Sequence, residues 1–533
     1  MNDNNEKKIK IYVALLITVI CVIGVSYAWF RLYLSQSENN KITARTCFDV
    51  SFTENTDKIS LVDAVPEDDS DGLREKPFTF TLKNNCEGYV KAYITIDSAY
   101  RTSTSSSYLK DNQVKVNVSP KGTVVSNGML LTAGELMEID NNSKGYVINV
   151  TGLESNEEKS FDLRLWMNSA VTQSDSLNKT WEGSVVVTAV AENHATWNNP
   201  GEGTLLAAIK RDNTVTTPTT TPGTEISADT EALLASTEDD YGTSYYFRGA
   251  VKNNYVEFAN KCWRIVRVSG DGSVKLILHN DNTAKAANPC SSANNSTSAA
   301  FARYSGTTYK SKFNSSSNDN AYVGFKYGTV GSSTYAATHA NTNKSTILTN
   351  LETWYNNNLK TYESVIEDTV WCNDKTNVTD TTYDPFNSTP NGLGYAKNVT
   401  YYGATQRLVS TSASAGGTGP SLKCDGELSK ITSKVGLITA DELAFAGYAY
   451  DLQNATTYLQ ENATDDWWWS LSPVFFRGDR AFVWVVRGGS GDFVDDRVHN
   501  TNGVRPSLSL VSNIKISSGT GIGTATNPYK IAF

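Results

Sequence analysis

The sequence predicts a multidomain fold class: an N-terminal transmembrane helix, an all-β sandwich domain and a C-terminal α+β domain. Three observations lead to it. Residues 11–30 contain no charge, residues 45–200 contain many short runs of alternating apolar and polar residues, and residues 240–533 combine such runs with apolar residues at helical spacing. A chain of 533 residues is long enough for two or three domains, each with its own core.

The uncharged segment 11–30 decides where the chain is expected to reside. At 1.5 Å per residue it is long enough to cross a bilayer as a helix and so to make the membrane a partner. Three lysines precede it within residues 1–10 and only Arg31 follows closely, so the positive-inside rule leaves 1–10 as a cytoplasmic tail. Ser26-Tyr27-Ala28 resembles a signal-peptidase site, which makes a cleaved signal peptide the alternative. The expected location is the cell membrane with extracellular domains, or the exterior after cleavage.

Composition argues against one class of partner and favours disulfides. Only 19% of the residues are charged and the net charge is −9, whereas binding of nucleic acid needs a clustered basic surface, so no nucleic-acid partner is expected. Cys21 lies in the uncharged segment, which leaves an even number of cysteines for the exported part. These are Cys47, Cys86, Cys262, Cys290, Cys372 and Cys424. No C-x-x-C or Cys/His spacing indicates zinc, so neither a metal nor a cofactor is expected.

Residues 45–200 have the pattern of an all-β domain. In residues 78–83 (FTFTLK) apolar and polar side chains alternate, which is typical of a half-buried strand. Similar runs, separated by polar turns, recur at 89–96, 114–118, 146–150, 161–165 and 185–190. Many short strands and no convincing helix predict a β-sandwich. Cys47 and Cys86 flank two of the strands and are expected to join them.

The start of the chain carries a resemblance. An uncharged helix that ends in YAWF is followed by a short polar stretch with KITA and then by a strand. This order resembles the TasA/camelysin-type exported proteins of Gram-positive bacteria over about the first 55 residues. The resemblance implies a signal peptide cleaved after Ala28, and some members of that family polymerise into matrix fibres. No proteolytic activity is carried over, because residues 45–200 contain no protease constellation.

A Thr/Pro tract is expected to divide the chain. Residues 213–224 (NTVTTPTTTPGT) offer little apolar surface to bury and predict an extended spacer of about 37 Å. The two halves are then expected to fold separately, because interfaces across such linkers are usually small.

Residues 240–533 mix strands and helices. Tyr255–Leu278 predicts a hairpin, and residues 345–359 predict a helix with Ser345 as its N-cap. Thr439 and Glu442 form a capping-box pattern that starts a helix over Ala440–Ala446. A turn at 503–506 is expected to begin a strand.

Specific side chains in this region are assigned to the scaffold. Arg505 is expected to bond to backbone carbonyls, and Trp467, Trp468, Trp469 and Trp484 are first interpreted as packing groups. The expected disulfides are Cys372–Cys424 across a long polar stretch and Cys262–Cys290 across a shorter one, although the sequence alone leaves the pairing open. Each bridge would stabilise the fold by about 3–4 kcal/mol.

An ordered set of motifs gives a second resemblance. NKCWRIV, VGFKYGT, LETWY, WCND, LKC, GLITADELAFAG, WWWSLSP and NGVRPSLSL follow one another over roughly residues 240–515. Together they resemble a large family of uncharacterised exported or surface proteins of low-GC Gram-positive bacteria. The C-terminal domain of that family resembles the C-type-lectin-like fold, which formylglycine-generating enzymes also use. The resemblance implies this fold for residues 240–533 and carries no biochemical activity with it.

No motif predicts an enzyme. Formylglycine-type oxidation needs a reactive cysteine pair near the C-terminus, and no cysteine follows Cys424. The sequence also lacks a nucleophile elbow, a phosphate loop and a convincing carboxylate dyad. The acidic run at 67–71 is interpreted as a solvated loop, with calcium binding as the alternative.

Residues 474–502 are the predicted ligand-contact segment. Aromatic, arginine and aspartate residues among glycines are typical of binding hot spots carried on loops. The predicted contact set is Phe476, Arg477, Asp479, Arg480, Phe482, Trp484, Arg487, Asp492, Phe493, Asp495, Arg497 and His499. The sequence therefore predicts a non-catalytic cell-surface recognition or adhesion protein whose ligand is an extracellular protein or glycan. The alternative is a structural subunit of a surface fibre or biofilm matrix.

Overall fold

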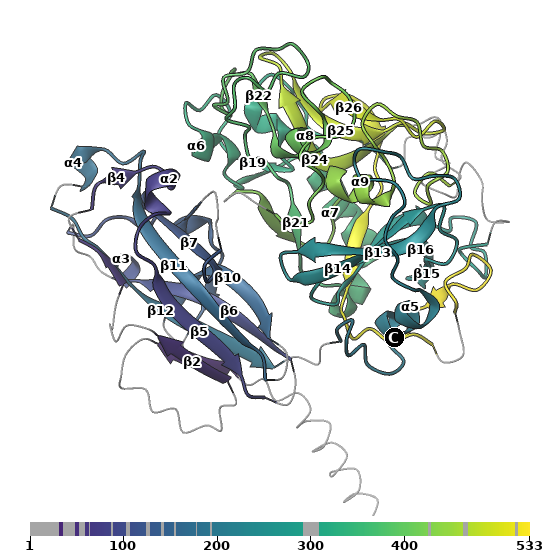
Figure 1. Cartoon of the computed structure of the whole chain (residues 1–533), viewed down its shortest axis with the longest axis horizontal. Helices are drawn as coiled ribbons and strands as arrows, with labels where there is room; N and C mark the ends of the chain where they lie inside the picture. The colour runs from purple at the N-terminus through teal and green to yellow at the C-terminus, as the bar shows by residue number, and fades with distance from the viewer. Residues whose placement is uncertain are drawn as a thin grey trace, which may run out of the picture. The chain divides into compact units, whose positions relative to one another are not determined.

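The computed structural model describes most of the chain. The described residues are 31–35, 48–52, 59–62, 64–86, 89–102, 107–123, 128–139, 143–153, 156–176, 178–191, 195–291, 309–424, 428–461, 467–517 and 521–532. They form two compact units that divide after Asn193, called here the sandwich unit and the C-terminal unit (Figure 1).

The predicted fold class requires a correction. Strands account for 39% of the structure and helices for 15%, and the strands form several sheets. Within the described residues no helix is both long and apolar enough to cross a membrane. The predicted transmembrane helix, 11–30, lies outside those residues, so the structure gives it no support. The C-terminal unit, which was predicted to be α+β, consists mainly of strands in several sheets, and its longest helix, α7, has only 13 residues.

Two sheets form the sandwich unit. The first has the order β1 (Arg31–Ser35), β12 (Trp181–Ala191), β6 (Val90–Ser98), β10 (Lys144–Leu153) and β9 (Leu136–Glu138), with β3 (Ile59–Leu61) also on β12. The second has the order β2 (Phe48–Phe52), β5 (Phe78–Asn84), β11 (Glu158–Asn168), β7 (Val114–Pro120) and β8 (Met129–Leu130), with β4 (Pro66–Glu67) also on β11. Three one-turn helices, α2 (Asp69–Gly72), α3 (Ala99–Thr102) and α4 (Gln173–Ser176), connect strands. The prediction of a β-sandwich is confirmed in this coarse form.

The alternation in β5 explains how a sandwich strand forms. Phe78, Phe80 and Leu82 are buried, whereas the intervening residues are not. The polar side is also used, because Thr79 Oγ1 donates to Asp162 on β11 at 2.8 Å. β5 thus buries its apolar face, while a threonine on its other face forms a side-chain hydrogen bond to the neighbouring strand.

The C-terminal unit contains two large sheets. A seven-stranded sheet has the order β13 (Ala232–Asp239), β14 (Gly242–Gly249), β16 (Lys261–Val268), β15 (Tyr255–Phe258) and β29 (Tyr529–Lys530), and β17 (Val274–Asn280) joins β16 to β28 (Ser507–Leu510). A six-stranded sheet has the order β18 (Lys310–Lys312), β27 (Thr501–Gly503), β24 (Trp468–Phe476), β25 (Ala481–Val486) and β26 (Phe493–Arg497), with β22 (Thr400–Tyr401) on β24. The two-stranded sheets are β19 (Lys326–Tyr327) with β20 (Asn343–Lys344) and β21 (Thr369–Cys372) with β23 (Lys430–Ser433).

Short helices connect the strands of the C-terminal unit. They are α5 (Leu205–Asp212), α6 (Tyr335–His339), α7 (Thr346–Asn358), α8 (Gly403–Leu408) and α9 (Ala440–Ala446). Single 3₁₀ turns are η1 (Asp111–Gln113) and η2 (Leu131–Ala133) in the sandwich unit and η5 (Asn320–Val323) and η6 (Lys360–Val365) in the C-terminal unit. Ser345 caps α7 as predicted, since its side chain accepts from Leu348 N.

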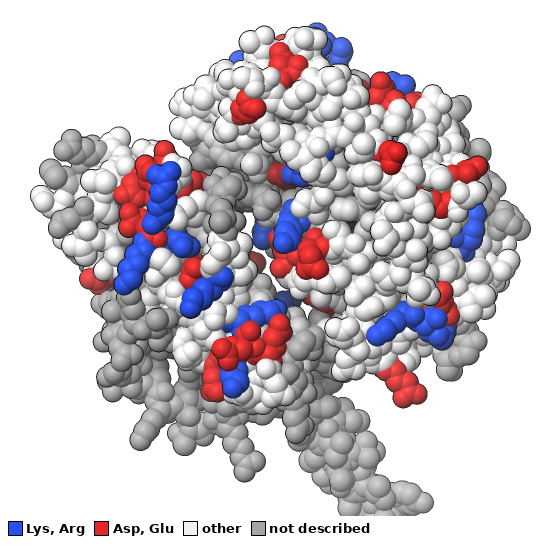
Figure 2. Space-filling model, in the orientation of Figure 1, with Lys and Arg blue, Asp and Glu red and all other residues white. Residues whose placement is uncertain are grey.

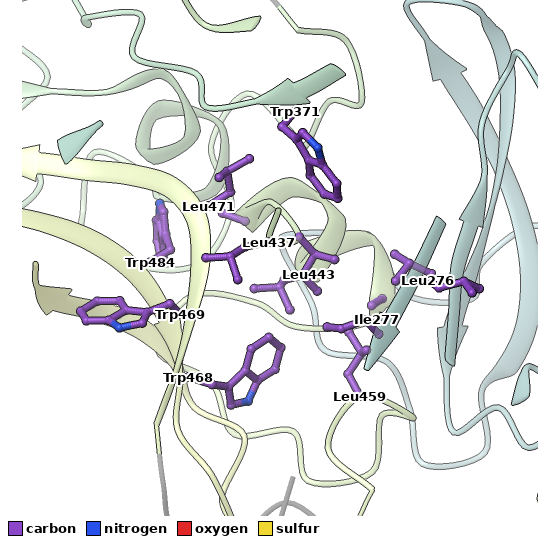
Figure 3. Close-up of a cluster of buried hydrophobic side chains, with 14 of the residues drawn as sticks. Leu276, Ile277, Trp371, Leu437, Leu443, Leu459, Trp468, Trp469, Leu471 and Trp484 are labelled. Carbon is purple, nitrogen blue, oxygen red and sulfur yellow. The ribbon is translucent and has the colours of Figure 1, made fainter. Parts of the chain in front are cut away.

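Tryptophans occupy the centre of the C-terminal unit. Trp371, Trp468, Trp469 and Trp484 are fully buried beside leucines from β17, α9 and β24 (Figure 3). Arg505 lies over the Trp468 ring at 4.8 Å and donates to the carbonyls of Leu278 and Leu459. The predicted packing roles of Trp468, Trp469 and Trp484 are confirmed, as are the predicted bonds of Arg505 to backbone carbonyls.

The Thr/Pro tract at 213–224 is not a free spacer. The boundary between the units precedes it, and α5, immediately before the tract, buries four apolar side chains in the core of the C-terminal unit. Within the tract, Thr219 N and Thr220 Oγ1 donate to the buried carboxylate of Glu231 at 2.8 Å each. Arg248 pairs with the same carboxylate at 2.9 Å. The tract therefore supplies hydrogen bonds to a buried ion pair, which its composition does not reveal.

A candidate ligand pocket in the C-terminal unit

The predicted contact set does not form one exposed surface. Phe476, Phe482, Trp484 and Phe493 are buried in the core, where Trp484 stacks on Phe493 with ring centroids 4.5 Å apart. Asp492 is also buried and accepts from Ser490 Oγ at 2.7 Å. These five side chains lie in the scaffold and offer almost no surface to a ligand.

The remaining members retain exposure but separate into groups. Arg477, Asp479 and Arg480 lie in the turn between β24 and β25, whereas Arg487 lies in the turn between β25 and β26. Consecutive hairpin turns are at opposite ends of their shared strand, and six residues of β25 span about 20 Å.

Asp495, Arg497 and His499 lie on or just after β26. The register places Arg497 opposite Phe482 and Asp495 opposite Trp484, further along the strand. Whether any of these residues contacts a ligand stays a prediction.

A polar pocket that the sequence did not predict lies elsewhere in the C-terminal unit. It is a small cavity of about 40 Å³ that is partly open to solvent. Its walls come from the β13–β14 turn, β16, β17, β21, α8, the start of α9, β24 and residues 421–424. We call it the charged pocket, because five acidic side chains (Asp239, Asp240, Asp374, Asp441 and Glu442) and four basic ones (Arg267, Lys275, Arg407 and Lys423) line it.

The first turn of α9 fixes two of the acids. Thr439 N donates to Glu442 Oε2 at 2.9 Å, and Glu442 N donates to Thr439 Oγ1 at 3.0 Å, so the predicted capping box is confirmed. The next helical turn is buried, which holds the backbone of Asp441 and Glu442 in place. Because the two acids are adjacent in the helix, their side chains point in different directions and bind different cations.

Glu442 binds two cations. Its Oε1 accepts from Lys275 Nζ at 2.6 Å and from Arg267 Nε at 2.9 Å. Burial alone would raise the pKa of this carboxyl, but the two cations lower it to about 2. Burial lowers the pKa of Lys275 to about 8, although Glu442 opposes that shift. Lys275 Nζ also lies 4.6 Å from the centre of the Trp371 ring.

Asp441 and Asp374 hold Arg407. The guanidinium donates through Nε and Nη2 to both oxygens of Asp441, at 2.7 and 2.8 Å, and its Nη2 lies 2.7 Å from Asp374 Oδ2. These carboxylates raise the pKa of Arg407 above its ordinary value despite burial. Ser421 N also donates to Asp441, at 2.9 Å, which ties residues 421–424 to the helix.

Asp239 fixes the other arginine. Arg267 Nη1 donates to Asp239 Oδ2 at 2.8 Å and to the hydroxyls of Ser244 and Ser269. Burial raises the pKa of Asp239, and Arg267 and the backbone N–H groups of Gly270 and Tyr241 oppose that rise.

Each arginine keeps one end free. Among the described residues, Arg267 Nη2 and Arg407 Nη1 have no hydrogen-bond acceptor, while the other guanidinium nitrogens are engaged. Both arginines line the pocket, and their side chains are only 11% and 17% exposed, so most of each group is buried. Each guanidinium therefore keeps one nitrogen whose N–H groups are available for a further hydrogen bond.

A disulfide closes one wall of the pocket. Cys372 and Cys424 are bonded, as predicted, and both line it. Cys424 N lies 3.3 Å from the carboxylate of Asp240, which also pairs with Lys430 at 3.0 Å. The predicted Cys262–Cys290 bridge is likewise present. Cys86 is disulfide-bonded, and its predicted partner, Cys47, lies outside the described residues.

The described residues contain no cluster of three or more histidine, cysteine or acidic groups placed to hold a metal ion. In the acidic run at 67–71, Asp68 caps α2, Asp69 pairs with Lys115 at 2.7 Å and Asp71 pairs with Arg74 at 2.9 Å. These acids therefore start a helix and bind lysine and arginine. On the face shown in Figure 2, acidic and basic side chains of the described residues occur together in small groups rather than in one extended patch.

Sequence reasoning found the start of α9 but not the charged pocket. Arg267, Arg407 and Glu442 are far apart in the chain, and only folding brings them together. The capping box at Thr439 was the one local signal. No protein-family model, curated protein or solved structure matches the chain.

Proposed function

We propose that this chain is an exported, non-catalytic recognition protein that binds an extracellular ligand in the charged pocket. The observation that carries the proposal is the pair of free guanidinium ends, Arg267 Nη2 and Arg407 Nη1, each on an arginine whose other donors are fixed by buried acids. Donors held in this way need no reorganisation on binding, which favours affinity and specificity. The disulfides support an oxidising environment outside the cytoplasm.

A binding role fits the pocket better than catalysis. Glu442 and Asp441 form ion pairs with cations, and Glu442 is ionised at any physiological pH because its pKa is about 2. A general acid or base needs a pKa near the working pH and freedom to exchange a proton. Glu442 does not meet the first condition, and both oxygens of Asp441 are held by hydrogen bonds from Arg407.

A substitution that fills the pocket without breaking an ion pair tests this proposal. Val370 lines the pocket from β21 and is partly exposed, so Val370→Trp places an indole in the cavity. Val330→Trp is the matched control, since Val330 is exposed and is not part of the pocket wall. Fluorescently labelled full-length protein is applied to panels of bacterial and epithelial cells. We expect wild type and Val330→Trp to bind the same cells and Val370→Trp to lose binding with its circular dichroism unchanged. Equal binding by all three proteins would contradict the proposal.

A second candidate is a structural subunit of a surface fibre or biofilm matrix. The observation that favours it is β1, a five-residue strand at the edge of the first sandwich sheet, paired from Arg31 with Val190 to Ser35 with Val186. A strand at a sheet edge can also pair with the edge of a second copy. Filaments or concentration-dependent oligomers that disappear on deletion of residues 31–35 would support this candidate. A monomer at all concentrations would remove it.

A further inference from the structure

We infer that the ligand of the charged pocket is a neutral, polyhydroxylated group of the saccharide class. This inference rests on the proposed function and specifies its ligand. Three features of the pocket carry it: the balance of its charges, the kinds of hydrogen-bonding groups it presents, and a partly exposed aromatic ring in its wall.

The charges in the pocket balance. Five acids and four basic groups line it, and Lys430 pairs with Asp240 at 3.0 Å to give a fifth basic group. With equal numbers of acidic and basic groups, the pocket has no net charge that would attract a free anion or a free cation. A neutral ligand needs no such charge, and it does not have to displace any ion pair.

The hydrogen-bonding groups match hydroxyls. The free ends of Arg267 and Arg407 can only donate, whereas carboxylate oxygens such as those of Asp240, which is 24% exposed, can only accept. A hydroxyl both donates and accepts, so neighbouring hydroxyls on one ring can bond to an arginine and an aspartate at once. Ligands with a single carboxylate or ammonium group would use only one of these two kinds of partner.

Tyr241 supplies the apolar part of the site. It lies between Asp240 and the start of β14, lines the pocket and is partly exposed. A sugar ring has an apolar face of C–H groups that packs on an aromatic ring, while its hydroxyls point to the polar walls. The pocket opens to solvent, so the hydroxyl-bearing edge of a terminal sugar ring can enter it while the rest of the ring and of the chain stays outside.

The experiment is a titration of the purified full-length protein with defined probes. The neutral probes are methyl glycosides of hexoses and N-acetylhexosamines, and the charged probes are glucuronate, inorganic phosphate and glucosamine. Binding is followed by calorimetry at low and high salt. We expect at least one neutral glycoside to bind, with an affinity that changes less than two-fold between the two salt concentrations, because no net charge is neutralised.

Variants locate the bound probe. Val370→Trp should remove binding and Val330→Trp should not. Tyr241→Phe should retain binding within about three-fold, because the ring is kept, and Tyr241→Ala should weaken it at least ten-fold. The Phe variant serves as the folding control for the Ala variant.

Three results would overturn the inference. Salt-sensitive binding of glucuronate, phosphate or glucosamine without any neutral glycoside would show a charged ligand and would leave the proposed function standing. In a second case the protein binds cells, and loses that binding in Val370→Trp, yet binds no glycoside. That result would show another class of ligand and would also leave the proposed function standing. Glycoside binding that survives Val370→Trp would place the saccharide outside the pocket.

Discussion

Lys275 and Glu442 form the most enclosed ion pair of the charged pocket, with Nζ and Oε1 2.6 Å apart and both side chains almost entirely removed from solvent. Arg267 shares the same carboxylate, and Trp371 covers the lysine. The pair joins β17 to α9 and thus connects the seven-stranded sheet to the helix that positions Asp441.

We predict that Lys275→Met lowers the free energy of unfolding by about 3–5 kcal/mol, because the variant leaves a buried carboxylate short of one partner. The matched control is Lys344→Met. Lys344 also lies 2.6 Å from a carboxylate, that of Glu352, but these side chains are 51% and 33% exposed, so a change below about 1 kcal/mol is expected. Guanidinium denaturation of both variants measures the difference. Similar losses in the two would contradict the role given to burial.

The environment of Asp495 leads us to predict that the stability of the protein depends on pH. Burial and the neighbouring Asp496 raise the pKa of its carboxyl to about 6, from an ordinary value of 3.8. The folded state then binds more protons than the unfolded state between those values, so this group makes the protein less stable as pH rises from about 4 to 6. We expect Asp495→Asn to flatten that part of the stability curve and to stabilise the protein at pH 7 by on the order of 1 kcal/mol.

The adjacent aspartate is the control for this prediction. Asp496 accepts hydrogen bonds from Asn500 and Asn502 at 2.7 Å each, one on each carboxylate oxygen, so Asp496→Asn replaces one acceptor by an NH2 group and is expected to destabilise. Thermal unfolding at several pH values separates the two cases. The prediction fails if Asp495→Asn destabilises at pH 7 as Asp496→Asn does.

The two described disulfides should differ in their effect on binding. Loop-closure entropy predicts that Cys372→Ser with Cys424→Ser costs about 4 kcal/mol and that Cys262→Ser with Cys290→Ser costs about 3.5 kcal/mol, because the bridged residues are 52 and 28 positions apart. Only the first bridge lines the charged pocket. At a temperature where both variants remain folded, cell binding should fall in the first and persist in the second. Equal loss in both would show that stability alone controls binding.

The Thr/Pro tract gives a prediction about fragments. A fragment of residues 195–533 retains α5 and the threonines that bond to Glu231, and we expect it to be soluble and to unfold cooperatively. A fragment of residues 225–533 lacks both and leaves the Arg248–Glu231 pair with fewer partners, so it should aggregate or melt at a lower temperature. Calorimetry of the two fragments, refolded with their disulfides, measures this difference. Equal melting temperatures for the two fragments would show that the tract acts only as a spacer.

Local patterns allowed part of the fold to be predicted. The alternation at 78–83 predicts β5, and the spacing of Thr439 and Glu442 predicts the start of α9, because both depend on residues close in sequence. The Cys262–Cys290 and Cys372–Cys424 bridges are the expected pairs, although the sequence alone left the pairing open.

The predicted contact segment shows why burial was harder to predict. Every residue of β24 and β25 is buried, so Phe476 and Trp484 belong to strands covered on both faces. A mixture of aromatic, arginine and aspartate residues is typical of a binding surface. Here the aromatic residues lie in the core, and most of the arginine and aspartate residues lie in or near the turns. The Thr/Pro tract was predicted to be a free spacer because it has little apolar surface to bury. Its hydroxyls and backbone groups instead stabilise a buried glutamate, which needs no apolar surface.

The charged pocket could not be predicted from local sequence patterns. Its ion pairs join residues such as Arg267 and Glu442, which lie on β16 and α9 and are 175 positions apart. Nothing in the residues around either one indicates the other.

A crystal structure of the full-length protein with a bound neutral glycoside tests whether the free guanidinium ends of Arg267 and Arg407 bind a saccharide. We predict electron density for a sugar ring against Tyr241, with hydroxyl oxygens about 2.7–3.2 Å from Arg267 Nη2 and Arg407 Nη1. A glycoside seated instead at the turns that hold Arg477 or Arg487, with the charged pocket containing only water, would contradict the claim.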